Sequence, residues 1–156
     1  MVMSSATLAS ELQNLTPRID EPGAAEALAE AYRVFALDAV GNGVPILPAG
    51  PDAGKLAMIP VLAGMSQPGA GALKIEQGVR AFWLAAALPA FFPGSIAALP
   101  PPTVGLANSL QPVFDSNTSG GATLEQAAQA VAAVMYANAI VGGTVTLPGP
   151  ATGPIL

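Results

Sequence analysis

Residues 123–148 carry the pattern that decides the fold: TLEQAAQAVAAVMYANAIVGGTVTLP. The stretch opens on Thr123, whose hydroxyl can cap a helix, and Gln126 three positions later can complete a capping box. An alanine-rich segment without proline or glycine follows, and alanine is the best helix former. Glycines then end the helix, and Thr144–Leu147 has the β-branched composition of a strand before Pro148. The stretch therefore predicts a long helix with an extended exit.

Parts of this pattern occur earlier in the chain at intervals of roughly 50 residues, a spacing typical of structural repeats. Each unit has a short segment that begins with Leu-Ala, then an alanine-rich segment that an acid opens, at Glu26, Glu76 or Glu125. A glycine and a short apolar stretch ending in Leu-Pro complete the unit. The chain is thus predicted to be mainly α-helical, with three repeated helical hairpins, each a short helix and a long helix. The predicted repeat units are about 4–48, 53–100 and 103–148.

The chain has 156 residues, which is enough for one domain with its own core. We expect residues 1–143 to form a single helical domain and residues 144–156 to form an extended C-terminal arm. Prolines and glycines in the arm exclude a regular helix. We expect the arm to add an extended segment or strand to an adjacent subunit.

Apolar residues at helical spacing predict the buried side of each long helix. In the third helix the alanines at 127, 130, 133 and 137 line a second face. Because small side chains let helices approach closely, this alanine face is expected to pack too, either in the chain's own core or against a neighbouring subunit. The predicted stripes are Leu28, Tyr32, Phe35 and Ala39; Val79, Phe82, Trp83 and Ala86; and Leu124, Ala128, Val131 and Met135.

Charge is concentrated in the first half of the chain. Between residues 81 and 156 only Asp115 and Glu125 are charged, and the formal net charge of the chain is −5. A free-standing soluble surface normally carries more charge, so this half is expected to lie in a membrane, against partner subunits or in a loosely ordered tail. Residues 81–99 are uncharged, but two prolines and a glycine interrupt them and no basic cluster flanks them. A transmembrane helix is therefore not expected.

Composition excludes several kinds of active site. The chain has no cysteine and no histidine, which excludes disulfides, thiolate or imidazole metal sites, cysteine nucleophiles and Ser-His-Asp triads. With only five Lys and Arg residues, no nucleic acid partner is expected. Residues 49–56 (AGPDAGKL) resemble a phosphate-binding loop, but Leu56 replaces the Ser or Thr that should hold Mg²⁺, and Pro51 lacks an N–H. We expect no enzymatic activity, no cofactor or metal and no small-molecule substrate.

The Ala/Pro/Gly-rich style of the whole chain, clear in residues 65–71, 119–126 and 142–148, resembles a class of phage proteins. These are the small structural proteins of tailed bacteriophages, particularly accessory tail, baseplate or neck subunits of contractile particles. The resemblance implies a non-enzymatic subunit of the virion, assembled in the host cytoplasm. Its partners would be other virion structural proteins and further copies of itself.

We expect assembly through apolar helix faces and the C-terminal arm. Two alternatives remain open at this point. One is a membrane-associated helical protein with residues 81–99 buried in lipid, and the other is a helical module that binds a small ligand through Tyr32, Asp38, Lys55 or Asp115. The residues expected to contact partners are Phe82, Trp83, Val131, Met135, Val145, Leu147, Ile155 and Leu156.

Overall fold

The computed structural model describes residues 2–15, 21–91, 97–147 and 152–156, and over these ranges the chain is mainly helical. The mainly α prediction is therefore confirmed. The helices are α1 (Ser5–Gln13), α2 (Glu21–Ala36), α3 (Ala49–Val61), α4 (Gly71–Phe91), α5 (Leu106–Ser119) and α6 (Leu124–Ala139).

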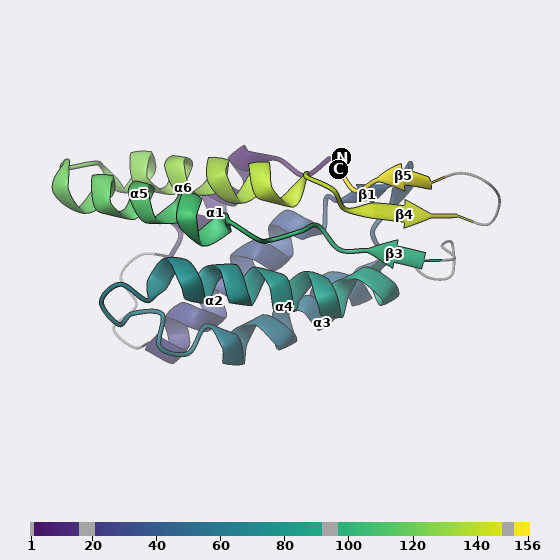
Figure 1. Ribbon diagram of the computed structural model, residues 1–156, viewed down its shortest axis with the longest axis horizontal. Helices are drawn as coiled ribbons and strands as arrows, with labels where there is room; N and C mark the ends of the chain where they lie inside the picture. The colour runs from purple at the N-terminus through teal and green to yellow at the C-terminus, as the bar shows by residue number, and fades with distance from the viewer. Residues whose placement is uncertain (1, 16–20, 92–96, 148–151) are drawn as a thin grey trace.

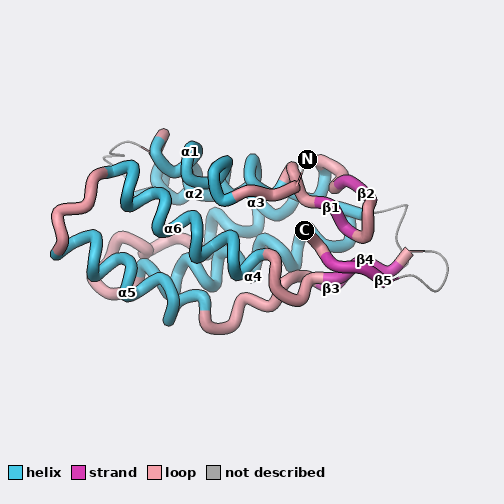
Figure 2. Tube along the Cα trace, turned by 90° about the horizontal axis from the view of Figure 1, so that it is seen from above, coloured by secondary structure: helices cyan, strands magenta, loops and turns pink. Residues whose placement is uncertain are grey.

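These helices form an elongated bundle in which each helix packs against the one before it and the one after it (Figure 1). The last helix, α6, packs against the first, α1, so that the helices close into a ring in sequence order. The connections from α3 to α4 and from α5 to α6 lie at one end, which we call the loop end, and the strands lie at the other, the sheet end (Figure 2). A closed ring has an inner side, which holds the core, and an outer side on every helix.

The first two strands form a tight hairpin at the sheet end. Strand β1 (Val40–Gly41) pairs antiparallel with β2 (Val44–Pro45) across a two-residue loop. Both loop residues have positive φ, +50° at Asn42 and +79° at Gly43, which is the conformation that an Asn-Gly hairpin turn adopts. Gly43 thus serves the hairpin turn.

The remaining strands come from the middle and the end of the chain. Strand β4 (Thr144–Thr146) lies between β3 (Ala97–Leu99) and β5 (Thr152–Pro154), and both pairings are antiparallel. Past β5, Val40 and Leu156 exchange two backbone hydrogen bonds, each of 2.9 Å. The C-terminal segment therefore links the β1–β2 hairpin to the three-stranded sheet.

The placement of the C-terminal segment corrects the prediction that residues 144–156 form an arm laid on another subunit. The strand expected at Thr144–Leu147 is present as β4, but β4 and β5 pair within the same chain. The side chains of Val145 and Ile155 are fully buried. The reason is that the backbone N–H and C=O groups of β3 and β1 lie beside the C-terminal residues. Pairing at the sheet end gives these groups hydrogen-bond partners from the same chain.

The inner side of the ring is filled by the predicted apolar stripes of α2 and α4. All eight residues of those two stripes are buried. Their aromatic rings meet one another: Tyr32 lies 4.9 Å from Phe82 and 6.4 Å from Trp83 between ring centroids, both edge-to-face. Trp83 Nε1 donates a hydrogen bond of 2.8 Å to the Tyr32 hydroxyl, which satisfies the buried indole N–H. Burial raises the pKa of the Tyr32 hydroxyl above its ordinary value, although this hydrogen bond opposes the shift.

Glycines inside α3 and α4 bring these two helices close together. A Cβ atom at Gly54 of α3 would lie 2.7 Å from the ring of Phe82, and one at Gly78 of α4 would lie 2.9 Å from Leu62. In each case a large side chain of one helix occupies the space that a Cβ would need on the other. Gly54 belongs to the segment that resembles a phosphate loop, and its role here is helix packing.

The structure also shows where the acids of the sequence pattern lie. Thr123 caps α6 with Gln126 as its capping-box partner, as predicted, and Glu125 lies in the first turn of that helix. Glu26 and Glu76, in contrast, lie more than one turn inside α2 and α4. Glu76 instead accepts a 2.7 Å hydrogen bond from the backbone N–H of Ala107, so that it caps the start of α5 from a neighbouring helix.

Replacement of the buried C-terminal isoleucine tests whether the segment belongs to the core. Ile155→Ala should lower the free energy of unfolding by about 2–5 kcal/mol, because it leaves a cavity under the sheet. The matched control Leu156→Ala removes a neighbouring side chain that is 44% exposed, and should change stability by less than about 0.5 kcal/mol. Urea unfolding measures both, and equal small effects would contradict the intramolecular placement.

Gly54→Ala tests the contact between α3 and Phe82. Alanine normally stabilises a helix interior by about 1 kcal/mol relative to glycine, but here the added methyl should cost about 1–3 kcal/mol through overpacking. In the background of Phe82→Leu the same substitution should cost less, because the ring that it meets is absent. A double-mutant cycle by chemical denaturation measures this coupling, and a stabilising Gly54→Ala in both backgrounds would refute the contact.

Candidate functional site

The structure places most of the expected contact residues inside the core. Phe82, Trp83, Met135, Val145 and Ile155 are buried within the chain. Val131 and Leu147 are partly buried and pack against that core, and the side chain of Leu156 is exposed. The prediction that these five residues contact partners is therefore wrong, because Phe82, Trp83 and Met135 face the inside of the ring of helices and Val145 and Ile155 are buried at the sheet end.

A different apolar surface is exposed along α6. Ala133 and Ala137 are exposed on the outer side of this helix, and Val141 just beyond it is 57% exposed. Val104, in the segment that leads into α5, is 85% exposed and lines a shallow groove of about 250 Å³ together with Ala137. We call this surface the α6 face, and it comprises Val104, Ala130, Ala133, Val134, Ala137 and Val141.

The α6 face is uncovered for a geometric reason. In the ring α6 packs against α1 and α5, and no further helix of the described ranges packs extensively against its outer side. The segment that carries Val104 is fixed beside it, because Pro101 and Pro102 pack against Gly143 and Gly142, where Cβ atoms would lie 2.9 and 3.0 Å from the proline rings. From the sequence, the alanine side of the third long helix is expected to pack either in the core or against a subunit. In the structure it is exposed at positions 133 and 137 and half-buried at 127 and 130.

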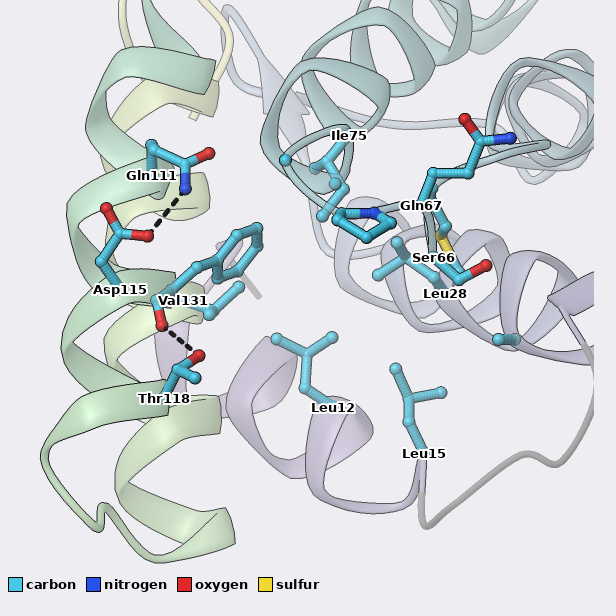
Figure 3. A pocket seen from close by; sticks show the side chains of 16 residues that line it. Leu12, Leu15, Leu28, Ser66, Gln67, Ile75, Gln111, Asp115, Thr118 and Val131 are labelled. Carbon is cyan, nitrogen blue, oxygen red and sulfur yellow. Dashed lines mark hydrogen bonds between the residues drawn. The ribbon is translucent and has the colours of Figure 1, made fainter.

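A second candidate site is a pocket of about 720 Å³ at the loop end of the bundle (Figure 3). Polar groups occupy its rim: Gln111 Nε2 donates a 2.8 Å hydrogen bond to Asp115 Oδ1 on one side, and Ser66 and Gln67 lie on the other. Its apolar lining is Leu12, Leu15, Ala24, Leu28, Met65, Pro68, Ile75, Phe114 and Val131.

A cluster of ion pairs joins α2 to α3 on the surface. Arg33 contacts Glu30 at 2.7 Å and Asp52 at 3.1 Å, and Lys55 contacts Glu30 at 3.0 Å and Glu26 at 3.9 Å. The hydrogen bond from Arg33 is the main reason that the pKa of Glu30 falls to about 2, with Lys55 contributing in the same direction. Since each cation of the cluster has carboxylate partners, the arrangement stabilises helix packing.

The polar residues considered for a small-ligand site do not converge. Tyr32 is in the core, Lys55 belongs to the ion-pair cluster, and Asp115 lies at the rim of the loop-end pocket. Asp38 follows α2 at the sheet end. Residues 49–56, which resemble a phosphate loop, are helical throughout as the first part of α3. Only Asp115 of this group lines the loop-end pocket.

Two further features concern the parts of the chain that the structure describes. No group of three or more acidic, histidine or cysteine side chains there is arranged to hold a metal ion. None of the helices there combines the length and the apolar character needed to cross a bilayer. Of the segment 81–99, the side chains of Phe82, Trp83 and Ala86 pack in the protein core, and residues 92–96 lie outside the described ranges.

The ion-pair cluster generates a pH prediction. Because the pKa of Glu30 is lower in the folded chain than its ordinary value of 4.5, its stabilising effect is complete above pH 4.5 and is lost as the pH falls towards 2. Glu30→Gln should therefore cost about 0.5–1 kcal/mol at pH 6, the range of partly exposed ion pairs, and much less at pH 2.5. Urea unfolding at the two pH values measures the difference. The control Glu125→Gln removes an exposed carboxylate outside the cluster, and an equal pH dependence of both variants would contradict the assignment.

No family model, curated protein or solved structure matches this chain. The α6 face, the loop-end pocket and the charges are therefore the features of the molecule that bear on its function.

Proposed function

We propose that the protein is a non-enzymatic structural subunit that assembles with further copies of itself and with other virion proteins through the α6 face. The observation that carries this proposal is the exposure of Val104 and Val141, at 85% and 57%, beside two exposed alanines on one helix. Apolar side chains grouped on one surface favour a protein contact, whereas single exposed ones are ordinary.

The composition of the α6 face supports contact with another helix. None of its six residues is charged, and four of them follow α6 with the spacing of neighbouring turns. Alanine side chains let a second helix approach closely, while the valines supply apolar area to bury. Such a contact between identical faces would be self-complementary around a twofold axis.

The assignment to a tailed-phage particle, as an accessory tail, baseplate or neck component, rests on the resemblance of the chain to Ala/Pro/Gly-rich virion proteins. The low charge of residues 81–156 supports a position among neighbours in an assembly, because Asp115 and Glu125 are the only charged residues in this part of the sequence. The location within the virion is part of the same proposal.

We further propose that the three helix pairs are copies of one unit. In support, the pairs α1–α2, α3–α4 and α5–α6 are each followed by a strand at the sheet end. Of the leucines in the Leu-Pro exits of the sequence pattern, Leu47 and Leu147 follow β2 and β4, and Leu99 is the last residue of β3. A shared origin of the units would explain why these exits meet in one place.

Val104→Asp tests assembly through the α6 face. The variant should fold with unchanged helical content, because the side chain is exposed, and it should dissociate the oligomer into monomers, because a carboxylate would be buried without a partner. Light scattering after size exclusion, in buffer without detergent, measures the mass of each variant over a range of concentrations.

The matched control is Leu56→Asp, which adds the same charge at a side chain that is 72% exposed on α3. It should leave the oligomer intact. If the native chain is a monomer at every concentration, or if both aspartates have the same effect, the proposed surface is wrong. Electron microscopy of the concentrated native chain then shows whether the oligomers are closed rings or open tubes.

A further inference from the structure

We infer that the loop-end pocket is a binding site for a small amphiphilic molecule with an apolar body and a single amine cation. The pocket has a volume of about 720 Å³, within the range of sites that hold small organic ligands. The site goes beyond the proposed assembly role and shares no residue with the α6 face.

The pocket exists because the core of the ring is filled unequally. The rings of Tyr32, Phe35, Phe82 and Trp83 pack together along the middle of α2 and α4. Towards the loop end the same helices carry Leu28 and Ile75, which are smaller and leave space between α1, α4 and α5. Apolar side chains from several helices therefore converge on an unfilled volume (Figure 3).

The charge of the lining decides the kind of head group. Asp115 is the only charged residue that lines the pocket within the described chain, and neither a lysine nor an arginine of those ranges lines it. A carboxylate or phosphate head group would meet this negative charge without a cation, whereas an ammonium group would be attracted to it. The Asp115 carboxylate accepts a hydrogen bond from Gln111 through Oδ1, and a carboxylate has further lone pairs that can accept from an ammonium donor.

The other polar groups of the rim fit the same ligand. Gln111 and Thr118 lie on the same helix as Asp115, and Gln67 lies on the other side of the pocket (Figure 3). Amide and hydroxyl oxygens accept hydrogen bonds, which an ammonium group with three N–H donors can supply. The apolar body of the ligand would then lie against the leucines and Phe114 deeper in the pocket.

Three probes with the same ten-carbon chain test the inference: decylamine, decanol and decanoate. Isothermal titration calorimetry, below the micelle concentrations of decylamine and decanoate and below the solubility limit of decanol, gives their affinities for the full chain. We expect decylamine to bind about fivefold more tightly than decanol, the upper effect of one exposed ion pair, and decanoate to bind most weakly. Octylamine should bind roughly tenfold more weakly than decylamine, because two methylene groups fewer are buried.

Asp115→Asn should remove the preference for the amine over the alcohol. The control for general attraction to an acidic protein is Glu125→Gln, which removes the same charge from a helical carboxylate that likewise accepts a hydrogen bond from a glutamine four residues away, but outside the pocket. It should leave the ratio unchanged. Equal losses in the two variants would overturn the role of Asp115.

Ala24→Leu tests the location, because the larger side chain would occupy part of the apolar lining at the start of α2. It should weaken binding of all three probes by tenfold or more, while Ala6→Leu, at an exposed position of α1, should not. Circular dichroism confirms that each variant is folded. Absence of binding by every probe, tightest binding of decanoate, or unchanged binding in Ala24→Leu would each overturn the inference.

Discussion

The contact between the Phe82 ring and the backbone at Gly54 is the constraint on which the rest of the structure depends. It sets the short distance between α3 and α4, and it holds Phe82 where its ring meets both Tyr32 and Trp83. The hydrogen bond from Trp83 to Tyr32 then joins α4 to α2 across the inside of the ring. A side chain larger than hydrogen at position 54 would displace the ring and with it the centre of the core.

At the sheet end the C-terminal segment closes the molecule. Strand β5 pairs with β4, and the residues after it pair with β1, so that one short segment connects the exits of the first and last helix pairs. Gly153 permits this close approach, because a Cβ atom there would overlap the side chain of Asn42 in the hairpin turn. The small sheet and the contact of α6 with α1 thus close the ring of helices at two places.

The same ring explains both candidate sites. Large aromatic rings fill its middle, whereas smaller side chains at the loop end leave the pocket beside Asp115. On the outside, charged side chains of α2 and α3 pair with one another, while the outer side of α6 carries valine and alanine without charge. One architecture therefore gives a charged face, an uncharged apolar face and an apolar pocket at one end.

The sequence by itself determined the helical class, the stripes of α2 and α4 that are buried, the capping box of α6 and the strand that follows it, because these depend on local spacing and local hydrogen bonds. It also identified the alanine side of α6, but apolar spacing does not tell which apolar face meets the core and which meets solvent. Only the tertiary structure decided that the stripe with Phe82 and Trp83 is covered within one chain rather than by a partner, and that Val104 is exposed, because ring closure brings together helices that are far apart in sequence. Only the tertiary structure showed that the C-terminal strands pair within the chain and that the loop-end pocket is unfilled. The strands pair with residues far away in the sequence, and the pocket lies between side chains of distant helices that do not fill the space between them.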